Sequence, residues 1–212
     1  MKILSELLNF LTESPELLIN ALLIHIKLVF CSEFGGIIVA VPLAIVITYQ
    51  RKIARFVLRI FNIINTIPSL VLLGISMSLL GVGFLPAAVA LFVYSIQPII
   101  QNTYAGLTQI ENKYLYAAKG MGMSEQQILF KVKIPMAAPY IISGIRISTI
   151  YIISWATLGA LIGAGGLGDL LYMGTSMNKM YYVIAGTVPA CMLAILVNIM
   201  FSKIEEKIIR ER

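Results

Sequence analysis

Five runs of apolar residues, each long enough or nearly long enough to cross a bilayer, constrain the fold of this chain more than any other feature. They cover residues 21–49, 63–80, 85–107, 137–162 and 181–201. A membrane-spanning helix needs about 20 predominantly apolar residues. The 212-residue chain is 59% hydrophobic and 12% charged, whereas soluble domains are about 25% charged. The sequence therefore predicts an all-α membrane protein with about five transmembrane helices.

The basic residues outside the cores of these runs predict the orientation of the chain. Those on one side are Arg51, Lys52, Arg55, Arg59, Lys113, Lys119, Lys131, Lys133, Lys203, Lys207, Arg210 and Arg212, and those on the other are Lys2, Lys27 and Lys179. Cytoplasmic loops carry the excess of Lys and Arg, so we expect the N-terminus outside and the C-terminus in the cytoplasm. The net charge of +6 then reflects membrane topology and does not indicate a nucleic-acid partner.

Three parts are expected along the chain. Residues 1–18 form an N-terminal interfacial segment, because residues 2–11 alternate apolar and polar at helical spacing. Residues 19–202 form the transmembrane domain, and residues 203–212 form a cytoplasmic tail. Five helices make a thin bundle, so we expect two such chains, identical or homologous, to pack together in the membrane.

A polar insert between the third and fourth runs is the most patterned part of the sequence. It reads YAAKGMGMSEQQILFKVKIPMAAP over residues 116–139. The pattern predicts a helix over 111–121 that stops at Gly122, because glycine accepts the left-handed conformation. Ser124 and Gln127 form a capping-box pattern that starts a second helix, and Pro135 is expected to end that helix. The insert is either a solvated connector or a docking element whose small surface residues, Ala117 and Ala118, admit another protein.

The residues of this insert resemble the permease subunits of binding-protein-dependent ABC importers. The family pattern is Glu-Ala-Ala, three residues, Gly, nine residues, then Ile-x-Leu-Pro. Its counterparts, at matching spacing, are Tyr116, Ala117, Ala118, Gly122, Val132, Ile134 and Pro135. A tyrosine stands where the family usually has glutamate. The resemblance implies that this loop supplies the coupling helix that sits in a cleft of a cytoplasmic ATPase subunit.

Four further stretches resemble the osmoprotectant branch of that family, which imports glycine betaine, carnitine and choline. They are NTIPSLVLLG at 65–74, GVGFLPAAVALFVYSIQPIIQNTYAG at 81–106, GIRISTIYIISWATL at 144–158 and IGAGGLGDL at 162–170. The last also resembles methionine-type permeases. The resemblance implies the type I ABC importer fold, a bacterial cytoplasmic membrane, and an external solute-binding protein.

The glycine-rich run at 162–170 does not have the context of a nucleotide site. Its glycines, Gly163, Gly165, Gly166 and Gly168, follow no strand, as a dinucleotide fingerprint requires. We expect them to form a tight turn at the outer mouth of the pathway. The sequence contains no GxxxxGK[ST] phosphate loop. We therefore expect a non-catalytic chain that binds no cofactor, with ATP and Mg used by a partner ATPase.

Four residues of the fourth run are candidates for lining the pathway: Arg146, Ser148, Tyr151 and Trp155. An intramembrane arginine is a functional hypothesis by default, but Arg146 also lies close enough to the cytoplasmic end to be an interface anchor. Tyr151 and Trp155 share a helical face. Their rings either attract a quaternary ammonium by cation–π interaction or pack between helices.

The remaining polar residues in the runs give weaker signals. We expect His25 to lie at the membrane interface, Glu33 to lie near the outer interface with no assigned role, and Cys31 and Cys191 to be buried apolar residues. A methionine permease is the nearest alternative function. An ion-coupled secondary transporter is a more distant one, since such proteins show midplane charges and inverted repeats. One histidine and scattered carboxylates give no pattern of enzyme catalysis and no metal site.

Overall fold

The computed structural model describes residues 2–210 and places almost all of them in helices, with no strand among them. Four helices are long and apolar enough to cross a membrane: α2 (Pro15–Ile47), α5 (Phe84–Thr108), the helix Glu125–Ile162 that contains α8 (Ile134–Ala156), and α10 (Met180–Arg210). A fifth crossing is obtained when the bent pair α3 (Arg51–Thr66) and α4 (Ser69–Leu80) counts as one span. The predicted all-α membrane fold with about five spans is confirmed.

The second predicted span, 63–80, is wrong as a continuous helix. The axes of α3 and α4 meet at 95°. Pro68 lacks a backbone N–H and excludes the helical conformation from the preceding residue, and Ile67 is accordingly extended, with ψ 130°. The Tyr94 hydroxyl of α5 donates a hydrogen bond of 2.5 Å to the Ile67 carbonyl oxygen, which ties the bend to the bundle.

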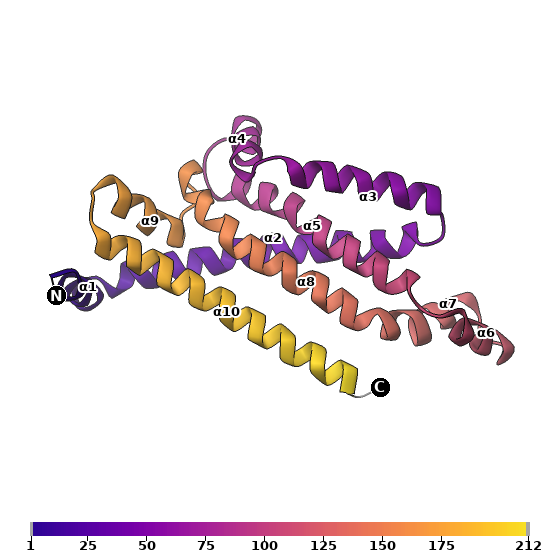
Figure 1. The fold of residues 1–212 in the computed structure, drawn as a ribbon. Coiled ribbons are helices and arrows are strands. Elements are labelled where there is room, and N and C mark those ends of the chain that lie inside the picture. The colour runs from indigo at the N-terminus through magenta and orange to yellow at the C-terminus, as the bar shows by residue number, and fades with distance from the viewer. Residues whose placement is uncertain (1, 211–212) are drawn as a thin grey trace.

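Helix α5 lies at the centre of the bundle, between α2 and α8 (Figure 1). A Cβ atom added at Gly36 of α2 would overlap Ser95 Oγ of α5, and one at Gly144 of α8 would lie 3.0 Å from the Pro98 carbonyl oxygen. Small residues therefore let these backbones approach closely, as is common between membrane helices. Alanine, leucine and isoleucine side chains of α2, α5 and α8 fill the core around these contacts.

The fourth span begins earlier than predicted, because Pro135 does not end the preceding helix. Helix α7 (Glu125–Ile128) continues through a π-helical turn (Leu129–Lys133) directly into α8. In that turn the Ile134 N–H bonds to the Leu129 carbonyl oxygen, five residues back. This wider turn accommodates the proline ring, which would collide with the preceding carbonyl in a regular α-helix.

The opposite end of the bundle holds the N-terminal helix α1 (Lys2–Glu13) and a short helix, α9 (Leu167–Ser176), which follows a 3-10 helix (Thr157–Ile162). Phe10 of α1 and Leu170 of α9 contribute to a core with α10. The helical conformation predicted for residues 2–11 is confirmed, whereas α9 was not predicted. Helix α10 continues to Arg210, so residues 203–210 are a helical continuation of the last span.

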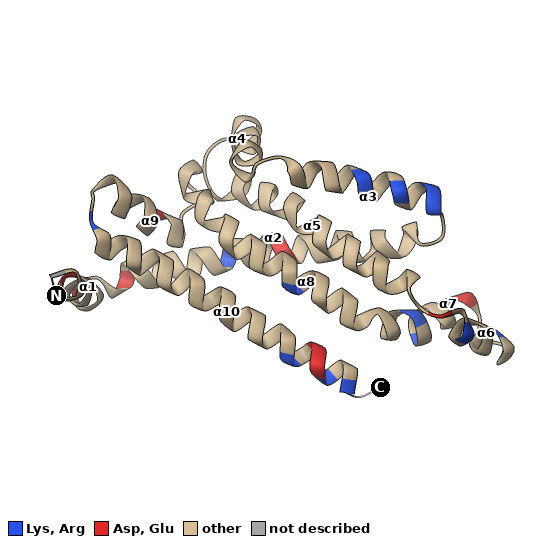
Figure 2. Ribbon diagram, viewed as in Figure 1, with Lys and Arg blue, Asp and Glu red and all other residues tan. Residues whose placement is uncertain are grey.

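Basic residues gather at one end of the bundle (Figure 2). That end is formed by the start of α3, the segment around α6 (Asn112–Gly120) and α7, and the last turns of α10. The two cysteines are exposed on the helices, so the prediction that they are buried is wrong. In a membrane protein an apolar segment presents part of its surface to lipid or to another chain, and hydrophobicity alone does not indicate burial.

Candidate functional site

The helical hairpin formed by α6 and α7 has the local geometry that the sequence predicts. Gly122 has φ +78° and lies just after α6. The Gln127 N–H donates to Ser124 Oγ at 3.3 Å, and the Ser124 N–H donates to Gln127 Oε1 at 2.9 Å. Both halves of the capping box are present, so the start of α7 is fixed by its own side chains.

An ion pair links the two arms of the hairpin. Lys119 Nζ of α6 lies 2.9 Å from Glu125 Oε1 of α7, with both side chains largely exposed. The hydrogen bond to Glu125 raises the pKa of the Lys119 ammonium. Exposed pairs contribute little to stability, so this contact chiefly restrains the angle between the arms.

The surface of the hairpin differs in one respect from the prediction. Ala117 and Tyr116 are exposed, but Ala118 is buried. Ile128 of α7 is buried as well, which shows that the inner side of α6 faces the second arm. One small residue, and not two, is therefore available on this surface. Beyond the hairpin, Val132 and Ile134 are half-buried and Pro135 is exposed.

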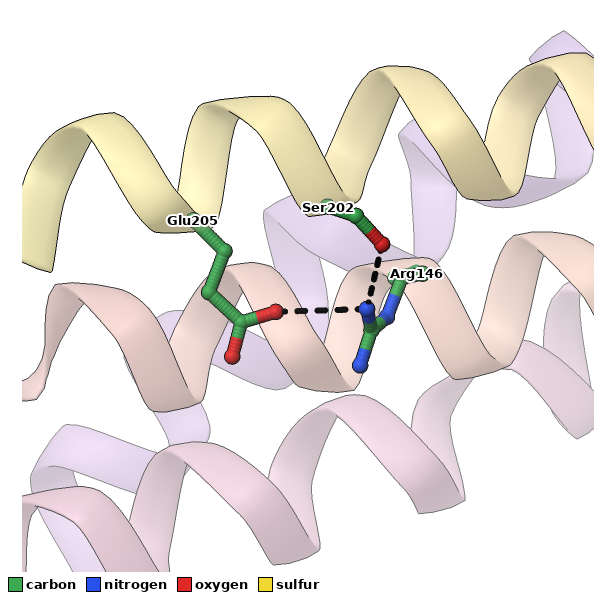
Figure 3. A network of polar contacts seen from close by, with 3 residues as sticks. All are labelled: Arg146, Ser202 and Glu205. Atoms are coloured by element: carbon green, nitrogen blue, oxygen red, sulfur yellow. Dashed lines mark hydrogen bonds and ion pairs between the residues drawn. The ribbon is translucent and has the colours of Figure 1, made fainter.

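Arg146 joins two spans instead of facing an open surface (Figure 3). Its Nη1 donates to Ser202 Oγ of α10 at 2.8 Å and lies 3.4 Å from Glu205 Oε2. The side chain is 25% exposed. Since both partners lie near the basic end of α10, the structure favours an anchor between α8 and α10 over a pathway-lining role.

Replacing Arg146 with methionine is expected to destabilise the folded chain by about 1–2 kcal/mol, because Glu205 loses its ionic partner in a partly buried site. The change should lower the thermal unfolding midpoint in detergent. Glu205→Gln, which leaves the bond between Arg146 and Ser202 intact, should have a smaller effect. Arg55→Met is the control, since Arg55 is exposed. Equal midpoints for the Arg146 and Arg55 variants would contradict the anchor.

Ser148 and Glu33 form a buried contact at the meeting point of three helices. Ser148 Oγ donates to Glu33 Oε2 of α2 at 2.8 Å and lies 3.2 Å from the Ser95 carbonyl oxygen of α5. Ser148 is fully buried in this conformation and Glu33 is 6% exposed. Glu33 therefore lies within the bundle rather than near an interface. Its Oε1 is buried and has no hydrogen-bond partner among residues 2–210. Glu33 is also one of the residues that line an apolar groove of about 320 Å³ between α2, α8 and α10.

His25 is also buried, which corrects the prediction of an interfacial residue. Its Nε2 lies 3.2 Å from the Ile153 carbonyl oxygen, and a Cβ atom added at Gly166 would lie 3.3 Å from the His25 Cα, Cβ and Nδ1 atoms. The imidazole therefore joins α2 to α8 and to the glycine-rich turn. No group of three or more His, Cys, Asp or Glu side chains in the described part of the chain is placed to hold a metal ion.

Tyr151 and Trp155 belong to a row of three aromatic rings. The Tyr151 and Trp155 ring centroids are 5.5 Å apart, and those of Trp155 and Tyr94 of α5 are 4.6 Å apart. Tyr151 is 46% exposed, Trp155 is half-buried, and Tyr94 is 2% exposed. The row thus runs from the interior of the bundle to its surface.

Four amide side chains of α3 and α5 were not predicted as a group. Gln97 Nε2 of α5 donates to Asn62 Oδ1 at 3.0 Å and to Gln101 Oε1 at 2.5 Å, and Asn65 Nδ2 donates to Gln97 Oε1 at 2.8 Å. Asn62 and Asn65 come from α3. The signal available in the sequence was the helical spacing of Gln97 and Gln101 within an otherwise apolar run.

The glycine-rich run forms the predicted turn. Gly163, Gly165 and Gly166 have φ angles of +74°, +79° and +91°. Gly168 is instead helical and buried in α9. A Cβ atom on Gly168 would overlap the Thr157 carbonyl oxygen, so this glycine is required for close packing of α9 against the 3-10 helix.

Residues 36–210 match the family described as the inner membrane component of binding-protein-dependent transport systems. The choline transport system permease protein OpuBB of Bacillus subtilis is 44% identical over 184 residues, which cover 87% of this chain and 85% of that protein. The osmoprotectant import permease protein OsmY of Salmonella typhimurium is 38% identical over 176 residues, covering 82% and 75%.

Solved structures share the fold. A chain of the MetNI methionine ABC transporter in an inward-facing conformation superimposes with a TM-score of 0.81 at 25% identity, over 92% of this chain and 98% of that one. A chain of an amino acid ABC transporter gives a TM-score of 0.73 at 20% identity, over 97% and 98%. The fold predicted from the sequence resemblance, that of a methionine-permease-like importer subunit, is confirmed.

Proposed function

Because the chain belongs to the family of inner membrane components of binding-protein-dependent transport systems, we propose that it is the permease subunit of an ATP-driven importer of quaternary-amine osmoprotectants. The observation that carries this proposal is the agreement over most of the chain with permeases named for choline, glycine betaine and carnitine transport. The likeness to the methionine transporter lies mainly in the fold, at about a quarter identity, and so it supports a methionine substrate less well.

The hairpin of α6 and α7 is the part of this chain to which an ATPase subunit would bind. It lies at the basic end of the bundle, away from α1 and α9 (Figures 1 and 2), and that end is cytoplasmic if positive charge stays inside. Its geometry is fixed locally by Gly122 and the capping box. A rigid, exposed pair of short helices can transmit a displacement, whereas a flexible connector cannot.

The proposed cycle divides the work between separate subunits. ATP and Mg bind to a partner ATPase, and its closure draws the hairpins of two permease chains together. Because α7 continues through the π-helical turn into α8, movement of the hairpin passes directly into a spanning helix. The pathway between the two permease chains then opens outward to an external solute-binding protein, and ATP hydrolysis restores the inward-facing state.

Reconstitution tests this function. Proteoliposomes that hold this chain, its ATPase and its binding protein are expected to accumulate radiolabelled glycine betaine, carnitine or choline only when ATP is supplied. Vesicles that hold this chain alone are the control and should accumulate none. Accumulation driven by a proton or sodium gradient in the absence of ATP would instead identify a secondary transporter, and preferential uptake of methionine would identify the methionine-type alternative.

A further inference from the structure

The amide group of α3 and α5 reaches the surface of the bundle, where a membrane-spanning helix should be apolar. Gln97 lies near the middle of α5, in a membrane-spanning segment. Asn62 and Gln101 are exposed, and Asn65 and Gln97 are half-buried. Polar side chains at membrane depth face other protein or a water-filled cavity and not lipid. This face of the bundle therefore contacts a solute or a second permease chain rather than lipid.

The hydrogen bonds within the group engage the side-chain oxygens of two of its amides. Gln97 Nε2 donates to the side-chain oxygens of both Asn62 and Gln101. An amide whose oxygen is held in this way keeps its NH₂ group for another acceptor. Gln97 thus acts as a positioning residue, and Asn62 and Gln101 present their NH₂ groups to whatever occupies the exposed face. Amide NH₂ groups are hydrogen-bond donors that suit a carboxylate or a hydroxyl oxygen.

The aromatic row continues the same face along α5. Tyr94 precedes Gln97 by three residues, a rise of roughly 4.5 Å along the axis, and residues three apart are neighbours on a helix surface. Trp155 contacts Tyr94, and Tyr151 extends the row to the surface. Aromatic faces bind quaternary ammonium groups, which have no N–H to donate.

We propose that these two groups form a single binding site for a quaternary-amine solute within the permease. The Tyr151 and Trp155 rings hold the trimethylammonium end, and the Asn62 and Gln101 amides, positioned by Gln97, hold the carboxylate or hydroxyl end. Arg146 does not serve as the carboxylate partner, because it is bound to Ser202 and Glu205. The inference rests on the proposed function and adds the residues by which the membrane subunit itself recognises its solute.

The chain contains a single tryptophan, Trp155, so the intrinsic tryptophan fluorescence reports on this site directly. In the full chain reconstituted in nanodiscs, glycine betaine and tetramethylammonium should each change the Trp155 emission saturably, whereas sodium chloride at equal ionic strength should not. Gln97→Leu should weaken glycine betaine binding roughly tenfold, because Asn62 and Gln101 are no longer held in place to hydrogen-bond the charged carboxylate. It should leave tetramethylammonium binding unchanged. Asn62→Ala, at an exposed position, should act in the same direction if the Gln97 variant does not fold.

Tyr151→Leu should weaken the binding of both solutes by roughly threefold or more, since both carry the quaternary ammonium. Tyr172→Leu is the matched control, because Tyr172 of α9 is 57% exposed and lies outside the aromatic row. The proposed site is contradicted if neither solute changes the Trp155 emission, or if Gln97→Leu weakens the binding of both solutes equally. ATP-driven uptake by the unmodified, fully assembled transporter, measured in parallel, separates failure of this site from failure of the proposed function.

Discussion

Replacement of Gly122 with valine is expected to reduce ATP-driven uptake by about tenfold or more, while the chain still inserts into the membrane. Gly122 has φ +78°. A left-handed conformation costs a residue with a Cβ atom about 1–2 kcal/mol, and this conformational cost is higher for a β-branched residue. The valine variant relieves this strain by changing the backbone between α6 and α7, which alters the angle at which the hairpin meets the ATPase. Uptake into proteoliposomes, measured at equal amounts of inserted chain, gives the readout.

Gly120→Val provides the matched control for that experiment. Gly120 lies two residues earlier, at the end of α6, without a positive φ angle. A Cβ atom would meet nothing within 4 Å at either glycine, so the two substitutions differ in backbone strain and not in crowding. The control should retain most of its uptake. Equal activity of the two variants would show that the angle of the hairpin does not transmit the ATPase motion.

Features that depend on local sequence could be predicted well. The capping box of Ser124 and Gln127 and the left-handed stop at Gly122 each involve residues within one or two turns. The third run, 85–107, coincides almost completely with α5, because hydropathy over a spanning length requires no knowledge of the partner helices. The resemblance of residues 116–135 to a family motif supplied the expected fold.

Features that depend on the packing of distant segments could not be predicted. His25 reaches a carbonyl oxygen 128 residues away in the chain, and Glu33 meets Ser148 across 115 residues. Hydropathy treats such residues as polar interruptions and places them at an interface. The amide group likewise joins α3 to α5 through bonds between residues 32 and 35 positions apart.

The same limitation applies to the glycine-rich run. The sequence predicted that all four glycines form a turn, but only three of them do. Gly163, Gly165 and Gly166 adopt positive φ angles, whereas Gly168 is helical and serves only to admit a neighbouring backbone. Sequence spacing does not distinguish a turn glycine from a packing glycine. The distinction matters because the second kind tolerates no side chain, however small.

Gly168→Ala is accordingly expected to be among the most destabilising single-methyl additions in this chain. The new Cβ atom would overlap the Thr157 carbonyl oxygen and lie 2.8 Å from the Ala160 Cβ atom. Overpacking against a backbone that cannot rotate away costs about 3 kcal/mol, equivalent to a fall of about 10 °C in the unfolding midpoint for a chain of this size. Thermal unfolding of the purified chain in mild detergent measures the change.

Gly74→Ala separates this packing effect from the general effect of placing alanine in a helix. Gly74 is also helical, in α4, but a Cβ atom there would meet nothing within 4 Å. Because alanine restricts the unfolded chain more than glycine does, this control should be neutral or slightly stabilising. If the two variants unfold within a degree of each other, α9 does not pack against the 3-10 helix as closely as the structure shows, and the turn that holds His25 loses its support.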